Sequence, residues 1–138
     1  MSLIFPYFGG EIRPFIPVTF EYKNKFVAIT ALVDSGSDVN MLLPVFADRL
    51  KIPYKRFTGS AKLIGGIGSG HKCVPWGLKC IIEGMNDEGK TEKCEIPMEV
   101  HIPIQKSSGF NLLGTQDFFE KFSVKIIHPQ KTIILDKL

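Results

Sequence analysis

The sequence predicts a mainly β fold with one or two short helices. Two observations lead to this fold class: several runs alternate apolar with polar residues, and clusters of glycine, asparagine and proline separate those runs. Alternation with a period of two places apolar side chains on one face of a strand. The length of 138 residues fits one domain, residues 1–138, with residues 1–12 as an N-terminal arm. Its first residues, Met1-Ser2-Leu3, are also compatible with a remnant of an expression vector.

The first pair of strands is expected between residues 16 and 34. Residues 16–22 alternate in the manner of a half-buried strand, and Lys23-Asn24-Lys25 suits a hairpin turn. Residues 26–33 are apolar on both faces and rich in β-forming side chains, which is expected of a strand buried at the centre of a sheet. That strand ends abruptly at Asp34.

A short helix and a long hairpin follow. Pro44 suits the first turn of a helix that continues through residues 45–50 and stops before Pro53. Residues 76–82 and 94–102 both alternate, and the polar turn between them predicts a long hairpin. The C-terminal elements are one or two helical turns in residues 116–122 and strands in residues 124–127 and 132–135.

The composition argues against two kinds of partner. Apolar residues make up 44% of the chain, and no segment approaches the roughly 20 consecutive apolar residues of a membrane span. The net charge of +3 comes from lysines spread along the chain, without the dense basic cluster of a nucleic-acid-binding face. We therefore expect a soluble globular protein with no membrane and no nucleic acid as partner.

The cysteines and the first residues bear on cofactors and location. Cys73, Cys80 and Cys94 form no C-x-x-C pattern and have no histidine at zinc-ligand spacing. We therefore expect reduced, mostly packed thiols, no metal site and no cofactor. The first residues lack the basic and apolar regions of a secretory signal. These observations favour a cytoplasmic protein or a domain excised from a longer chain.

The chemistry of the sequence centres on Asp34. A carboxylate that closes an apolar strand is costly to keep ionised unless hydrogen-bond donors surround it, and a Ser35-Gly36 turn supplies N–H groups that can point back at it. The same tripeptide also suits an ordinary turn, in which an aspartate or serine side chain bonds to the nearby backbone. Asp-Ser-Gly alone leaves both interpretations open.

A glycine-rich stretch in residues 63–70 suggests either a phosphate-binding loop or a hairpin lid. The dinucleotide-binding fingerprint requires a different glycine spacing and a helix after it. Here Pro75 and the alternating run from Trp76 predict a following strand, and residues 61–64 are strand-like as well. The stretch is therefore expected to be a hairpin lid and not a phosphate-binding loop.

Three segments together resemble one family. The segment Leu32-Val33-Asp34-Ser35-Gly36-Ser37-Asp38 resembles the catalytic loop of aspartic proteases, residues 62–68 resemble the flap of the retroviral enzymes, and Asn111-Leu112-Leu113-Gly114 resembles the motif that packs behind the catalytic loop. In this order, over residues 13–135, the chain resembles the retropepsin-like aspartic proteases. The resemblance implies a closed acid-protease barrel with a β-hairpin flap, and a homodimeric aspartic endopeptidase that acts on a peptide or protein substrate.

The resemblance also assigns roles to individual residues. The catalytic positions are those of Asp34, Ser35 and Gly36. The substrate-binding positions are those of Asp38, Gly65, Gly66, Ile67 and Gly68.

A physical argument independently requires a second chain. Peptide hydrolysis by acid–base catalysis needs one carboxylate to take a proton from water while another gives one to the carbonyl oxygen. Because the chain has one Asp-Ser-Gly, the second carboxylate is expected from Asp34 of a twofold-related subunit. The pair would share one proton, so activity is expected at acidic to near-neutral pH.

Two departures from the family pattern leave questions open. An arginine usually follows the last glycine and helps to brace the catalytic loop, whereas Thr115-Gln116 follow Gly114 here, so that brace is missing or supplied elsewhere. Arg13-Pro14 resembles a pair whose arginine contacts an acidic residue across the dimer, but it also suits a solvated loop. The alternative function is therefore a catalytically inactive peptide-binding or dimerisation module.

Overall fold

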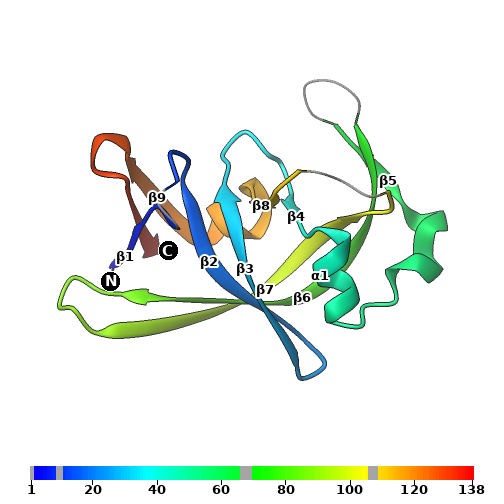
Figure 1. Ribbon diagram of the computed structural model, residues 1–138, viewed down its shortest axis with the longest axis horizontal. Helices are drawn as coiled ribbons and strands as arrows, with labels where there is room; N and C mark the ends of the chain where they lie inside the picture. The colour runs from blue at the N-terminus through cyan, green and yellow to red at the C-terminus, as the bar shows by residue number, and fades with distance from the viewer. Residues whose placement is uncertain (1, 9–10, 66–69, 106–108) are drawn as a thin grey trace.

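The computed structural model describes residues 2–8, 11–65, 70–105 and 109–138, and its architecture is mostly β (Figure 1). The strands are β1 (Ser2–Pro6), β2 (Phe15–Tyr22), β3 (Lys25–Val33), β4 (Asn40–Met41), β5 (Lys62–Ile64), β6 (His71–Met85), β7 (Thr91–Pro103), β8 (Asn111–Leu113), β9 (Phe122–Ile127) and β10 (Thr132–Lys137). Between them lie the α-helix α1 (Pro44–Arg49), the 3-10 segments η2 (Tyr54–Ser60) and η4 (His128–Gln130), and the π-type turn η3 (Thr115–Phe119).

Six of the strands close into a barrel. Their hydrogen-bonded order is β2-β3-β8-β4-β7-β6, and β6 pairs again with β2, where Phe20 lies opposite Cys80. The β3–β8 and β4–β7 pairs are parallel. The closed ring confirms the predicted barrel, and the parallel β3–β8 pair brings the carboxyl ends of these two strands side by side.

A small sheet of β1, β10 and β9 extends the barrel beyond β6. β1 pairs antiparallel with β10 from Ser2↔Asp136 to Pro6↔Thr132, and it meets β6 at Ile4. Both ends of the chain therefore lie in one sheet (Figure 1). The sequence pattern places residues 1–12 in an arm without predicting this strand, because little more than buried Leu3 and Phe5 marks its inner face.

Several predicted elements form where the sequence indicates. Lys23 and Asn24 join β2 to β3 with positive φ values of 47° and 64°, as a two-residue hairpin turn requires. The predicted helix is α1, which begins at Pro44, and the predicted long hairpin is β6–β7. The C-terminal helical turns and strands correspond to η3, β9 and β10.

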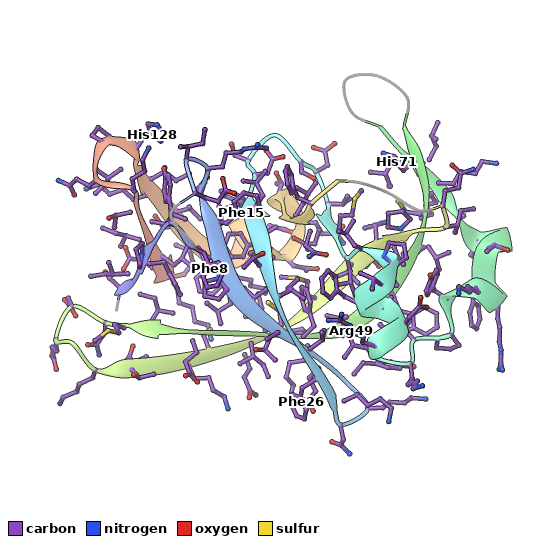
Figure 2. All side chains as sticks on the ribbon, viewed as in Figure 1. Phe8, Phe15, Phe26, Arg49, His71 and His128 are labelled. Atoms are coloured by element: carbon purple, nitrogen blue, oxygen red, sulfur yellow. The ribbon has the colours of Figure 1, made fainter. Side chains whose placement is uncertain are left out.

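The prediction that residues 26–33 are buried on both faces is wrong. Phe26 is 60% exposed and Ala28 is also exposed, whereas Val27 and Ile29 are buried. The reason is that β3 alternates like a strand with one face in the core: residues 27, 29, 31 and 33 are buried, whereas residues 26, 28, 30 and 32 lie on the outer face of the barrel. Figure 2 shows Phe26 near the end of β3 that adjoins the turn with β2.

The core fills the barrel and supports the strands that end at the site. Its largest fully buried side chains include Phe20, Phe118, Ile16, Leu42, Leu50 and Ile82. Full burial of one such side chain contributes about 1.5–3 kcal/mol to the stability of the fold. Helix α1 adds Ala47 to this core and packs on β3 and β7.

The three cysteines are free thiols, as the sequence predicts. Cys73 and Cys80 are buried and Cys94 is half-buried. Burial raises the pKa of the Cys73 thiol to about 11, so this group stays protonated and acts as a small apolar side chain.

Candidate active site

Asp34 is the first residue after β3, and neighbouring segments fix its backbone. Its N–H donates to the carbonyl oxygen of Leu113 at 3.0 Å, and its own carbonyl oxygen accepts from the Ser37 N–H at 3.1 Å. One residue earlier, the Val33 N–H donates to the carbonyl oxygen of Pro14 at 3.0 Å. These bonds hold the carboxyl end of β3 between the segment before β2 and the end of β8.

The Asp34 carboxylate is half-buried and is held by its own turn. Its Oδ1 atom accepts a hydrogen bond from the Gly36 N–H at 2.9 Å. A Cβ atom on Gly36 would lie 3.2 Å from the same oxygen, so glycine lets the amide approach without crowding the carboxylate. Ser35 and Gly36 are exposed beside it. The predicted catalytic residues thus form one tight turn that solvent can reach.

The segment after Gly114 holds the far side of this turn. The Thr115 N–H donates to the carbonyl oxygen of Ser37 at 2.8 Å, and the Gln116 N–H donates to that of Asp38 at 3.0 Å. The side of the turn that lacks an arginine is therefore braced by two backbone N–H groups. Asp38, a predicted substrate-binding residue, is exposed at this point of the turn.

Gly114 itself packs against the turn more closely than any other residue type could. It is buried, and a Cβ atom there would lie 2.3 Å from the carbonyl oxygen of Val39 and 2.6 Å from that of Ser37. Only a residue without a side chain fits at these distances. The sequence-predicted pairing of Leu-Leu-Gly with the Asp34 turn is thus a direct backbone contact.

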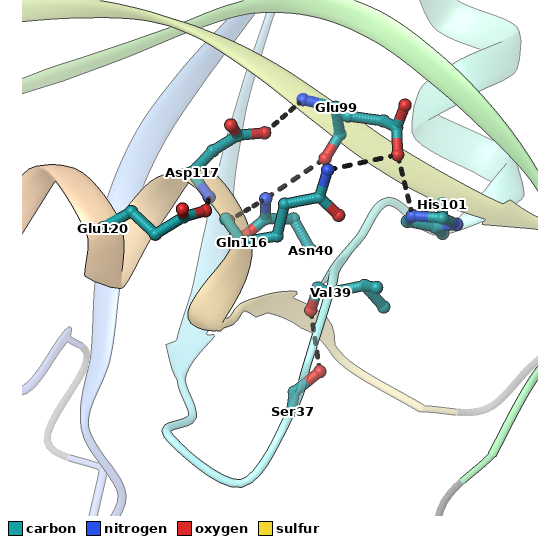
Figure 3. A network of polar contacts seen from close by, with 8 residues as sticks. All are labelled: Ser37, Val39, Asn40, Glu99, His101, Gln116, Asp117 and Glu120. Atoms are coloured by element: carbon teal, nitrogen blue, oxygen red, sulfur yellow. Dashed lines mark hydrogen bonds and ion pairs between the residues drawn. The ribbon is translucent and has the colours of Figure 1, made fainter.

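Asn40, in β4, links this region to the opposite side of the barrel (Figure 3). The side chain is fully buried. Its Nδ2 atom donates to the carbonyl oxygens of Glu99 at 3.1 Å and Gln116 at 2.9 Å, and its Oδ1 atom accepts from the Gly114 N–H at 2.8 Å. One side chain therefore joins β4 to two other backbone segments, β7 and residues 114–116.

Glu99, on β7, anchors the other half of the network in Figure 3. Its N–H donates to Oδ2 of Asp117 at 2.8 Å, and its Oε1 atom lies 3.3 Å from both Gln116 Nε2 and His101 Nε2. Asp117 has a φ of 65°, which is uncommon for a residue other than glycine. The bond from Glu99, and a second bond from the Asp117 N–H to Glu120 Oε1 at 2.8 Å, hold it in that conformation.

His101 is buried beside this network. It is 5% exposed, and neither ring nitrogen meets hydrogen-bond geometry with a partner in the described part of the chain, although Nε2 lies 3.3 Å from the Glu99 carboxylate. Burial lowers the pKa of His101, the negative charge of Glu99 opposes this shift, and the positive charge of Lys62 adds to it. The imidazole is therefore neutral at neutral pH.

Acidification is expected to destabilise the fold through His101. Because its pKa in the fold lies below the value of about 6.5 for an unfolded chain, the unfolded state binds more protons as the pH falls. The stability that neutral His101 provides is complete above that unfolded pKa and is lost as the pH falls to the lower folded pKa. Thermal unfolding at pH 7 and pH 5 should show a smaller drop in Tm for His101→Leu than for the native chain.

Exposed His71 supplies the control for this measurement. The variant His71→Gln should retain the native pH dependence of Tm. If His101→Leu loses as much Tm on acidification as the native protein, His101 does not contribute to the pH dependence.

Two paired strands flank the segment predicted to be a lid. β5 and β6 pair antiparallel from Lys62↔Cys73 to Ile64↔His71, as expected for two strands that flank a hairpin. Gly65, a predicted substrate-binding residue, follows β5 and is exposed. Three other predicted substrate-binding residues lie outside the described part of the chain: Gly66, Ile67 and Gly68.

Arg13 contacts an aromatic side chain that the sequence does not single out. Its guanidinium carbon lies 4.9 Å from the ring centroid of Phe110, and this ring meets Phe15 edge-on at 5.1 Å. Phe15 and Phe110 also line a hollow with Phe8, which lies near Phe15 in Figure 2. Arg13 is thus placed by a cation–π contact within its own chain.

Among the described residues, no group of three or more His, Cys, Asp and Glu side chains is arranged to hold a metal ion. In the same part of the chain, no helix is long and apolar enough to cross a membrane.

Comparison with known proteins finds similarity in structure. No protein-family model and no curated protein sequence matches the chain. Its structure is similar to the crystal structure of a retropepsin-like aspartic protease from Rickettsia conorii, with a TM-score of 0.62 and 20% sequence identity, over 98% of this chain and 88% of that chain. At this identity the similarity concerns the fold alone. The chain therefore has the fold of a retropepsin-like aspartic protease.

Proposed function

We propose that the chain is an aspartic endopeptidase that works as a homodimer. The geometry of Asp34 carries the proposal: a half-buried carboxylate closes a core strand and accepts the Gly36 N–H in a turn that solvent reaches. An ordinary turn does not require the close backbone packing of Gly114 against Ser37 and Val39 that is found here. The fold shared with a retropepsin-like aspartic protease supports the same interpretation.

The chemistry requires two carboxylates in different protonation states. One takes a proton from a water molecule as the water attacks the peptide carbonyl carbon, and the other gives its proton to the carbonyl oxygen. The resulting tetrahedral intermediate breaks its C–N bond as the leaving nitrogen takes the proton that the first carboxylate received from water, and a hydroxyl of the intermediate returns a proton to the second carboxylate. The sequence offers one Asp-Ser-Gly, so the second carboxylate in this proposal is the partner subunit's Asp34.

Apolar side chains beside Asp34 favour a particular kind of substrate. Leu32 precedes Asp34 by two residues on the same face of the strand, and its register partner on β8 is Leu112. Both leucines are half-buried, and Phe110 is exposed two residues before Leu112. The proposed substrate is an extended peptide with large apolar side chains next to the cleaved bond.

The substrate backbone would be held from two sides. Asp38 is exposed in the catalytic turn and offers backbone and side-chain groups to a peptide. The second side is the predicted contact with residues 65–68, of which the structure describes Gly65, exposed after the end of β5.

The alternative function is an inactive peptide-binding or dimerisation module, motivated by the missing arginine after Gly114. The backbone bonds from Thr115 and Gln116 brace the turn without an arginine. Because these bonds can replace the brace that the arginine would give, its absence is only weak support for an inactive module.

Incubation with a mixture of varied peptides from about pH 3 to pH 7, followed by mass spectrometry, tests the proposal. We expect cleavage beside large apolar residues, with a bell-shaped pH dependence from the shared proton. Specific activity should rise with protein concentration in parallel with the dimer fraction from sedimentation. No cleavage by a preparation that sediments as a dimer would overturn the proposal, and binding without cleavage would favour the inactive module.

A further inference from the structure

We infer that Asn40 is a positioning residue of this site: its buried side chain sets the place of the turn that carries Asp34 without contacting the substrate. The inference rests on the proposed function and deepens it, because it names a residue outside the Asp-Ser-Gly motif on which turnover depends.

Three backbone groups from two distant segments, β7 and residues 114–116, converge on the amide of Asn40. The hydrogen-bond partners of Asn40 are the carbonyl oxygens of Glu99 and Gln116 and the N–H of Gly114, at sequence separations of 59, 76 and 74 residues. The side chain is fully buried, so water has no access to replace these bonds. An asparagine side chain offers both a carbonyl oxygen and an NH₂ group, which is the combination that these partners need.

A continuous path of hydrogen bonds leads from Asn40 to Asp34. Asn40 holds the backbone at Gly114 and Gln116, and between them the Thr115 N–H donates to the carbonyl oxygen of Ser37. The Ser37 N–H in turn donates to the carbonyl oxygen of Asp34. A shift of residues 114–116 therefore moves the turn that orients the carboxylate.

Contacts that do not involve Asn40 are expected to keep residues 114–118 folded when Asn40 is replaced. Gln116 Nε2 still donates to Glu99 Oε1, and the Glu99 N–H still donates to Asp117 Oδ2. Phe118, just beyond, is anchored in the core. Loss of the Asn40 amide is thus expected to displace the turn and not to unfold the barrel.

Kinetics of two variants and a matched control test the inference. At a temperature where all are folded, Asn40→Ala should lower kcat about 10- to 100-fold and leave KM within about threefold, because the reacting groups are misplaced while the binding surface persists. Asn86→Ala is the control, since Asn86 is another buried asparagine that accepts backbone N–H bonds, from Glu88 and Lys90 in the β6–β7 turn. It should lose stability but keep kcat within about twofold.

The variant Asn40→Asp adds a readout that a purely structural role would not produce. A carboxylate keeps the acceptor for the Gly114 N–H but loses both donors, whereas a protonated carboxyl regains one donor. The ratio of its kcat to that of the native protein should therefore rise as the pH falls. A ratio that does not change with pH would contradict the assignment.

Two further outcomes would overturn the inference. One is an unchanged kcat for folded Asn40→Ala, and the other is an equal loss of kcat in Asn86→Ala. Amide hydrogen exchange provides a test that needs no activity: exchange at Ser37 and Thr115 should accelerate in Asn40→Ala and stay native in Asn86→Ala. If the native protein cleaves no peptide, the proposed function fails, but exchange still decides the positioning role, and unchanged exchange rejects it.

Discussion

Replacing Asp34 by asparagine is expected to lower peptide turnover about 100- to 10,000-fold, because an amide neither takes a proton from water nor gives one to the carbonyl oxygen. The fold should survive, since the asparagine Oδ1 atom can accept the Gly36 N–H as the carboxylate does. The measurements are kcat, Tm and the affinity for an uncleaved peptide. Asp48→Asn, which removes an exposed carboxylate from α1, should leave all three near their native values.

Mixing native and Asp34→Asn subunits separates a shared site from two independent sites. If each site needs both carboxylates, a freely exchanging equal mixture contains about one quarter fully native dimers, and its activity falls to about that fraction of the same total amount of native protein. Independent sites would leave about one half. An activity of one half after demonstrated subunit exchange would contradict the paired-carboxylate mechanism.

Replacing Gly114 by alanine is expected to lower the free energy of unfolding by about 1–3 kcal/mol or more. The new Cβ atom would meet the carbonyl oxygens of Val39 and Ser37 at 2.3 and 2.6 Å. Both atoms belong to the backbone of the turn that follows Asp34, so relief of the clash displaces that turn. Urea unfolding and kcat should both report the change, with turnover lost even where the variant is folded.

Gly77→Ala is the matched control for this substitution. Gly77 lies in β6 and is exposed, and a Cβ atom there meets nothing within 4 Å. Its free energy of unfolding should change by no more than about 0.5 kcal/mol. If Gly114→Ala were as stable and active as Gly77→Ala, the backbone at Ser37 and Val39 would have room for a Cβ atom at residue 114, and the expectation would be wrong.

The parts of the fold that could be predicted from the sequence are those with one face in the core. β2, β6 and β7 alternate over many residues, since each strand has one side against the barrel interior, and this pattern is visible along the chain. β1 has too few residues to establish a period and depends on pairing with β10. The exposure of Phe26 is not visible in the sequence either, because apolar residues occupy both faces of β3 although only one face lies in the core.

The same distinction applies to the candidate site. Asp34, Ser35 and Gly36 are adjacent, so local chemistry indicates them together. Asn40 stands alone between apolar residues in the sequence, and its hydrogen-bond partners come from β7 and the segment after β8. No spacing along the chain reveals contacts of that kind. The hydrogen bonds that support the candidate site therefore depend on tertiary structure, whereas the Asp-Ser-Gly motif can be recognised from neighbouring residues in the sequence.

The long-range support of Asp34 also has a consequence for the order of events during synthesis. A ribosome completes Asp34 early, but the backbone groups that fix its turn belong to Leu113, Gly114 and Thr115. β1 likewise cannot form its hydrogen bonds with β10 until residues 132–136 have been synthesised. Contacts between such distant segments form late, since the intervening chain must first be closed into a loop. A nascent chain thus carries the carboxylate without the means to orient it, and the Asp34 turn is completed only after residues 113–115 have been synthesised.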